Sequence, residues 1–156
     1  MTTTERARSD NNIWGFSLGV YTLSAVENAP DFSVIRGCHC LAARKTARAI
    51  TRVFEQRLRP HGLRATQFSV LAALTLKGPT PLGELAELLG LERTSLTRTA
   101  AIVVRNGWIA EEQSKDARER LLKVTPEGRR KLEDAFPAWK EAQDRVGREF
   151  GLERNG

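Results

Sequence analysis

The chain has 156 residues, of which 40% are hydrophobic and 28% charged, an ordinary composition for a globular protein. With 25 Lys and Arg against 19 Asp and Glu, its formal net charge is +6, which favours a polyanionic partner because neutralised phosphates release counterions. Two cysteines exclude a disulfide framework and favour a reducing compartment. Charge alone does not separate DNA, RNA and a membrane surface as partners.

No uncharged apolar run approaches the roughly 18 residues of a membrane span. The apolar stretch from Ile13 to Val26 follows two arginines, as in a signal peptide, but glycine, serine and threonine interrupt it. We therefore expect a cytoplasmic protein without a membrane segment.

The first 33 residues combine a polar tail, Met1 to Asn12, with a stretch from Ile13 to Phe32 that mixes aromatic residues with glycine and proline. The second stretch follows neither a helical nor a strand period. We interpret residues 1–33 as an N-terminal tail or arm that either packs on a partner subunit or has no role.

Helical periodicity begins at about Val34 and continues to Leu58, where Pro60-His61-Gly62 end it. Its apolar side consists of Ala43, Ala47, Ile50, Phe54 and Leu58. A helix this long, with small residues along its apolar stripe, needs a long partner. A second helix is predicted from Thr66 to Lys77, closed by Gly78-Pro79.

Thr80 and Pro81 form the predicted cap and first residue of a third helix, which closes at Gly90. A short link leads to a fourth helix within Glu92 to Trp108, stopped by Asn106-Gly107. The apolar stripe of the fourth helix consists of Leu96, Ala100, Val103 and Val104, and the opposite face carries Thr94, Ser95 and Arg98. Short hydroxyls beside Arg suit a nucleic-acid groove, so the pair of helices indicates a helix-turn-helix. The alternative is an ordinary surface helix with a few arginines.

A hairpin follows, with predicted strands at 108–112 and 119–124 joined by a turn at 114–117. A hairpin directly behind a helix-turn-helix is a wing, and Arg118 and Arg120 near its tip can enter a minor groove. Thr125-Pro126 then predicts the start of a last helix running to about Phe150, whose spaced apolar residues indicate packing.

Five motifs occur in order: G-L-x-x-x-Q-F-x-x-L-x-x-L at Gly62–Leu74, L-x-E-L-A-E-L-L-G-L at Leu82–Leu91, R-T-S-L-T-R at Arg93–Arg98, N-G-W-I at Asn106–Ile109, and D-x-R followed by five residues and V-T-P-E-G at Asp116–Gly128. Through this ordered set the chain resembles the MarR (multiple-antibiotic-resistance regulator) family of bacterial transcriptional regulators, over about Cys38 to Val146. It departs from the family at Arg64, where Thr or Ser usually starts the second helix, so we expect Thr66 to cap a helix that begins late.

The resemblance implies a mostly α fold with a small β-hairpin wing. Residues 61–125 would form a winged helix-turn-helix DNA-binding domain, and residues 34–60 and 126–150 the dimerisation helices of a homodimer. Such a dimer would bind double-stranded DNA at a pseudo-palindromic operator with half-sites about 34 Å apart, most simply as a repressor.

The resemblance also implies a set of DNA contacts. Thr94, Ser95, Thr97 and Arg98 would contact the groove and phosphates, and Arg118 would reach the minor groove, positioned by Asp116. Arg93 and Arg98 of the helix, with Arg118 and Arg120 of the wing, would match duplex geometry on a dimer.

Many members of the family release DNA when a small aromatic or acidic effector binds between the dimerisation helices and the winged domain. Candidate pocket residues here are His39, Arg44, Arg48, His61, Phe68 and Trp139, together with Trp14 and Phe32. Packing or solvated surface is the alternative for each of them.

Cys38 and Cys40 are candidate oxidant sensors, because neighbouring His and Arg can lower the pKa of a thiol. Two apart on a helix they would point to nearly opposite sides, which favours a bond between subunits over an internal disulfide. The alternative is that both act as small hydrophobic residues. We expect no metal site, because two Cys and two His would have to supply all four ligands, and no cofactor.

An enzyme is not expected, because the chain has no G-x-S-x-G motif, no phosphate-binding glycine loop and no metal-binding His spacing. The sequence therefore predicts a DNA-binding regulator released by a small ligand or by cysteine oxidation. The alternative is a winged-helix module that binds RNA or another protein, because a fold does not determine its ligand.

Overall fold

The computed structural model describes residues 30–113 and 120–152 of the chain, which divides into two compact units, Met1–Cys38 and His39–Gly156. The described part of the first unit holds one 3-10 helix, η1 (Phe32–Gly37). Asp31 caps it, because its carboxylate accepts hydrogen bonds from the backbone N–H and the hydroxyl of Ser33 at 2.9 and 2.8 Å. These two bonds lower the pKa of Asp31.

The expectation of one continuous helix from Val34 to Leu58 is wrong. The 3-10 turn ends at Gly37, Cys38 has an extended backbone with φ −61° and ψ 110°, and the α-helix begins only at His39. Glycine has a low helix propensity, and the N–H of Cys38 is already bonded to the carbonyl of Ile35, so the chain leaves the helical path there.

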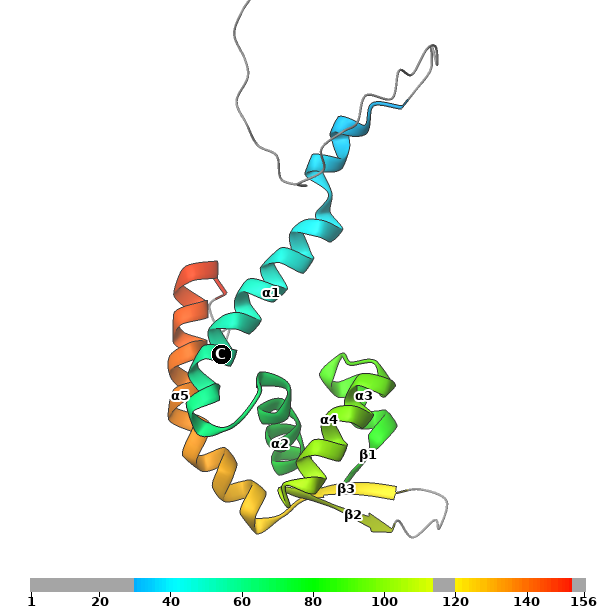
Figure 1. Ribbon diagram of the computed structural model, residues 1–156, viewed down its shortest axis with the longest axis vertical. Helices are drawn as coiled ribbons and strands as arrows, with labels where there is room; N and C mark the ends of the chain where they lie inside the picture. The colour runs from blue at the N-terminus through cyan, green and yellow to red at the C-terminus, as the bar shows by residue number, and fades with distance from the viewer. Residues whose placement is uncertain (1–29, 114–119, 153–156) are drawn as a thin grey trace, which may run out of the picture. The chain divides into compact units, whose positions relative to one another are not determined.

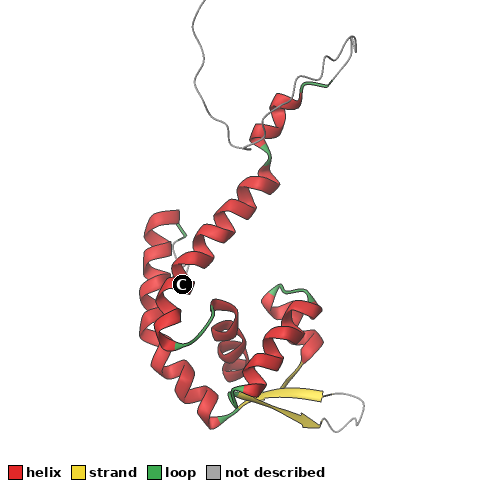
Figure 2. Ribbon diagram, viewed as in Figure 1, coloured by secondary structure: helices red, strands yellow, loops and turns green. Residues whose placement is uncertain are grey.

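The second unit contains five α-helices and a small antiparallel sheet within the described ranges (Figures 1 and 2). The helices are α1 (His39–Leu58), α2 (Ala65–Lys77), α3 (Leu82–Leu89), α4 (Arg93–Arg105) and α5 (Pro126–Phe150), with a 3-10 turn η2 (Arg59–His61) after α1. The strands are β1 (Thr80–Pro81), β2 (Ile109–Gln113) and β3 (Arg120–Val124), in the order β1-β3-β2. The predicted fold class, mostly α with a β-hairpin wing, is confirmed.

The main core lies between α2, α3, α4 and the sheet. Its fully buried side chains include Leu58, Leu63, Leu71, Leu85, Leu96, Val103 and Ile109. Burying each such side chain stabilises the fold by about 1.5 to 3 kcal/mol. Of the apolar stripe expected on α4, Leu96, Ala100 and Val103 are buried and Val104 is half-buried. One face of this helix therefore packs in the core, and the opposite face is exposed to solvent.

A smaller cluster joins α1 to α5, which lie side by side in Figure 1. It contains Val53, Ala142 and Val146, with Phe54 and Phe150 packed against it. Only the second half of α1 takes part in this packing. From His39 to Arg48 the helix buries no side chain, and Ala43 and Ala47 are exposed.

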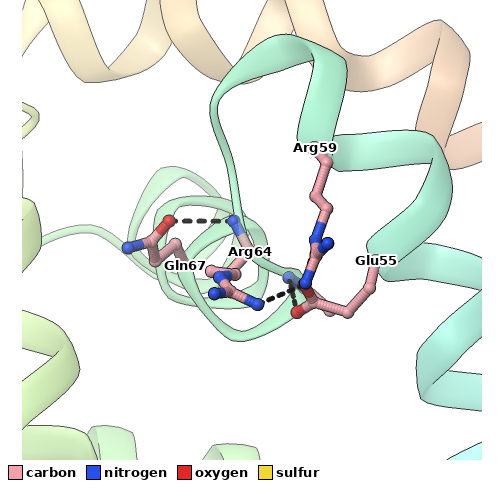
Figure 3. Close-up of polar contacts among 5 residues, drawn as sticks. Glu55, Arg59, Arg64 and Gln67 are labelled. Atoms are coloured by element: carbon pink, nitrogen blue, oxygen red, sulfur yellow. Dashed lines mark hydrogen bonds and ion pairs between the residues drawn. The ribbon is translucent and has the colours of Figure 1, made fainter.

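The start of α2 differs from the expectation that Thr66 caps a late helix. The helix begins at Ala65, and its N-cap position is Arg64, whose backbone N–H donates to Oε1 of Gln67 at 2.8 Å. The carboxylate of Glu55, on α1, accepts the N–H of Ala65 (Figure 3). Side chains outside the cap position thus accept two of the free N–H groups of this helix end, those of Arg64 and Ala65, without a Thr or Ser at the cap.

Thr80 and Pro81 do not open the third helix as expected. They form β1, which pairs antiparallel with β3 through Thr80 and Leu122 and through Pro81 and Leu121, and α3 starts at Leu82. Thr80 is buried, and its hydroxyl donates to the carbonyl of Gly78 at 2.9 Å instead of accepting from the helix. Pairing with a distant strand prevails here over a local capping signal.

The predicted start of the last helix is confirmed. Thr125 accepts the N–H of Gly128 at 3.0 Å, and its hydroxyl donates to the carbonyl of Gly107 at 2.7 Å. Gly128 lies so close to the chain at Trp108 that a Cβ there would stand 1.9 Å from the Trp108 carbonyl oxygen. The first turn of α5 is thereby held against the chain between α4 and β2.

Candidate nucleic-acid interface

The turn between α3 and α4 is fixed by backbone hydrogen bonds. Gly90 has a left-handed conformation (φ 60°), its N–H donates to the carbonyl of Glu87, and the N–H of Leu91 donates to the carbonyl of Ala86 at 2.9 Å. These bonds form a glycine C-cap that ends α3 and redirects the chain within three residues. Leu85 on α3 and Leu96 on α4 are both fully buried in the main core, so the two helices pack together as a helix-turn-helix.

The solvent face of α4 carries the predicted contact residues. Arg93, Thr94, Ser95, Thr97 and Arg98 are all exposed. The hydroxyl of Thr97 donates to the carbonyl of Arg93 at 2.8 Å, so its only proton is already used. Because phosphate oxygens only accept, Thr97 is unable to donate to a phosphate while this bond persists, whereas among the described residues the hydroxyls of Thr94 and Ser95 have no hydrogen bond.

The wing presents charged residues on both of its faces. Arg120 pairs with Glu111 at 2.6 Å, and Lys123 pairs with Glu112 at 3.3 Å, each pair joining β2 to β3. All four side chains are about half exposed or more. Asp116 and Arg118, expected at the tip, lie outside the described residues.

A hollow of about 990 Å³ lies between the start of α3, α4 and the wing. Its lining includes three of the predicted contact residues, Arg93, Thr97 and Arg120, and two acidic residues that sequence reasoning missed, Glu84 and Glu111. Glu84 pairs with Lys77 at 2.5 Å. Strand alternation could have indicated Glu111, because residues two apart share a face of a strand and Glu111 therefore shares the face of the buried Ile109. The structure therefore brings helix and wing arginines around one concavity.

The candidate effector residues are brought together only in part. The rings of Phe68 and Trp139 stack with centroids 5.6 Å apart, and both line a hollow of about 480 Å³ between α2, α3 and α5. Trp139 also lines a second hollow of about 280 Å³ with Ile50 and Phe54. Neither hollow is lined by His39, Arg44 or Arg48, which are exposed on the first half of α1.

His61 lines neither of these hollows. Its Nδ1 lies 3.0 Å from Oδ2 of Asp134 on α5. The hydrogen bond from His61 lowers the pKa of Asp134. This residue therefore joins η2 to α5.

Both cysteines are free, Cys38 half-buried and Cys40 exposed in the first turn of α1. Contrary to expectation, the two cysteines do not lie two apart on one helix, because Cys38 is extended and precedes α1. Within the described ranges no three His, Cys, Asp or Glu side chains gather as metal ligands. No described helix is long and apolar enough to span a membrane.

The model of the MarR family matches residues 63–119. Two curated relatives from Bacillus subtilis, the HTH-type transcriptional regulators YwoH and YkoM, are 36% identical over 90 residues and 33% identical over 95 residues. Each match covers 58% of this chain, and they cover 66% and 62% of the relatives, so the chain spans slightly less than two thirds of each.

Solved structures extend the likeness. The Mycobacterium tuberculosis transcriptional regulator MosR in complex with DNA is 37% identical with a TM-score of 0.65, over 70% of this chain and 80% of MosR. A second structure of MosR is 32% identical with a TM-score of 0.67, over 74% and 84%. Wild-type MarR from Escherichia coli shares the fold at 21% identity and a TM-score of 0.63, over 71% and 84%.

The family is one of transcriptional regulators and not of enzymes. The helix-turn-helix and the two strands of the wing follow one another in the same order as the motifs, and a long helix lies on either side of them. The chain belongs to the MarR family of winged helix-turn-helix proteins.

Proposed function

We propose that the protein is a homodimeric transcriptional repressor that binds a pseudo-palindromic DNA operator in the cytoplasm. The observation that carries this proposal is the solvent face of α4. It presents Thr94, Ser95 and Arg98 on a helix whose other face is locked in the core, beside a wing that carries Arg120. Arg reads guanine edges, and the small hydroxyls allow close approach to the backbone. The DNA complex of MosR supports the same partner here.

The dimer is proposed from the exposed first half of α1. Ala43 and Ala47 continue the apolar side that Phe54 and Leu58 bury further along the helix, yet both are exposed and belong to neither hydrophobic cluster of the described residues. A second copy would cover this stripe, with residues 34–60 and 126–150 forming the dimerisation region. Residues 61–125 of each chain would then read one half-site of a two-fold operator.

Release by an effector is proposed from the hollow beside Phe68 and Trp139. It lies between α2, α3 and α5 and is lined almost wholly by apolar side chains, which suits a small aromatic molecule. Arg44 and Arg48 would meet an acidic group only if the partner's α1 supplied them. Oxidation of Cys40, which is exposed, is the second means of release that we propose.

The test is binding of the purified full chain to the DNA immediately upstream of its own gene, at fixed salt with random duplex as competitor. Binding that resists the competitor supports a sequence-specific regulator, and release by oxidant that reductant reverses supports sensing by cysteine. Binding no tighter than to random duplex would contradict the proposal and direct the search to RNA or protein partners.

A further inference from the structure

The two faces of the wing carry two ion pairs of the same construction. The strand register pairs Glu111 with Leu122 and Gln113 with Arg120. Directly paired residues share a face of the sheet and neighbours alternate, so Glu111 and Arg120 lie diagonally on one face, which we call the inner face. Glu112 and Lys123 lie diagonally on the outer face. One hairpin thus repeats an acid–base pair on each side.

Only the inner pair lines the hollow beside α4. Glu111 and Arg120 are part of the lining together with Arg93 and Thr97, whereas Glu112 and Lys123 are not. The guanidinium Nη1 of Arg120 lies 2.6 Å from Oε2 of Glu111, and 79% of the Arg120 side chain is exposed. The wing cation that lines this hollow is therefore already paired with a carboxylate of its own wing.

We propose that Glu111 sets the affinity of this surface for DNA by holding Arg120 in the free protein, and that a backbone phosphate replaces Glu111 when a duplex binds. The inference rests on the proposed function. An exposed ion pair contributes little to stability, so Arg120 is free to exchange partners, and a phosphate contact gains counterion release that the pair with Glu111 lacks. Binding of a duplex then costs the interaction energy of the pair between Glu111 and Arg120, which weakens binding.

The exchange concerns affinity and not sequence reading. Phosphates carry no sequence information, so removal of the Glu111 charge should strengthen binding to operator and to random duplex by the same factor. A carboxylate that competes for Arg120 thus lowers the affinity of this surface for operator and random duplex alike. Glu111 is accordingly a positioning residue, which acts through Arg120 and need not touch the duplex.

The outer pair provides the matched control. Glu111→Gln and Glu112→Gln remove the same charge from adjacent residues of one strand, and the two carboxylates have similar exposures of 46% and 52%. General repulsion between protein and DNA changes almost equally in both variants. The pair with Arg120 is lost only in Glu111→Gln.

The experiment measures the Kd of the full chain for both duplexes by fluorescence anisotropy over a range of salt concentrations. We expect Glu111→Gln to bind both duplexes about three- to fivefold more tightly than Glu112→Gln. This factor corresponds to the interaction energy of one exposed ion pair. In an Arg120→Ala background this difference should vanish. The slope of log K against log salt should then become shallower by the amount that corresponds to the loss of about one phosphate contact. Circular dichroism would establish that all variants are folded.

Equal affinities of the two Gln variants would overturn the inference, and so would a gain from Glu111→Gln that persists in the Arg120→Ala background. Both outcomes leave the proposed function intact, because the wild-type chain still binds. Failure of the wild-type chain to bind either duplex would overturn the proposed function itself and this inference with it.

Discussion

The carboxylate of Glu55 on α1 accepts a hydrogen bond from the backbone N–H of Ala65, the first residue of α2, at 2.9 Å. Its other oxygen lies 3.1 Å from Nη1 of Arg64 and 3.9 Å from Nε of Arg59 (Figure 3). An acidic residue ten positions upstream thus does the capping that the Arg64 side chain is unable to do. This contact ties α1 directly to the first helix of the winged domain.

Replacing Glu55 should therefore destabilise the fold. Glu55→Ala leaves the N-terminal N–H of α2 without its acceptor, and we expect a loss of about 1 to 2 kcal/mol, the usual cost of a lost helix cap. The measurement is urea denaturation with an unchanged m-value. Glu141→Ala is the control, because Glu141 forms an exposed pair with Arg57 and should cost less than about 0.5 kcal/mol. Equal losses in the two variants would rule out the capping role.

Gly128 is required by the close approach of α5 to Trp108. In Gly128→Ala the new methyl group would meet the Trp108 carbonyl, and the shift needed should cost about 2 to 3 kcal/mol. Gly83→Ala in α3 is the opposite case, because nothing lies within 4 Å of its Cβ position, so it should gain about 0.5 to 1 kcal/mol of helix propensity. Thermal melting of the two variants should shift in opposite directions, and a Gly128→Ala melt as high as that of the wild type would refute the tight contact.

The hydrogen bond between His61 and Asp134 predicts that the stability of the fold decreases at acidic pH. The pKa of Asp134 is lowered from 3.8 in the folded protein, so the carboxylate stabilises the fold above pH 3.8, and this contribution is lost as pH falls through the lowered value. Carbon-13 NMR titration of Asp134 should give a midpoint below 3.8 that returns toward 3.8 in His61→Ala. A midpoint unchanged by that substitution would show that His61 does not cause the shift.

If the exposed apolar stripe of Ala43 and Ala47 on α1 forms the dimer interface, a charge placed in this stripe should weaken the dimer. Ala47→Glu should weaken the dimer strongly, because an interface would bury the new carboxylate without a partner. Ala42→Glu makes the same change on the same helix, about a third of a turn from the stripe, and should leave the dimer intact. Sedimentation equilibrium at several protein concentrations distinguishes the two variants. A dimer of unchanged strength in Ala47→Glu would place the interface elsewhere.

Arg98 is the predicted base-reading residue of α4. Arg98→Ala should weaken operator binding by about 1 to 3 kcal/mol and reduce discrimination against random duplex. Arg148→Ala removes the same charge near the far end of α5 and should change both affinities slightly and equally. If Arg98→Ala weakens operator and random duplex equally, Arg98 contacts phosphate and not base edges.

The sequence by itself determined the elements whose signals are local. The apolar stripe of Leu96, Ala100 and Val103 predicted α4 and the helix face that is exposed to solvent. Gly107 has the left-handed conformation expected at the end of that helix (φ 73°). Thr125 followed by Pro126 predicted the start of α5. In each case residues within about one helical turn supply the cap, the turn or the buried stripe, so short-range pattern and final structure agree.

Only the tertiary structure decided the features that depend on distant residues. Thr80 is part of a strand because its backbone pairs with that of Leu122, far along the chain. The side chain that caps α2 is Glu55, on another helix. The pairing of Glu111 with Arg120 likewise required the register of β2 and β3. Local preferences are worth about a kcal/mol or less, and the burial and hydrogen bonding gained when distant segments meet outweigh them.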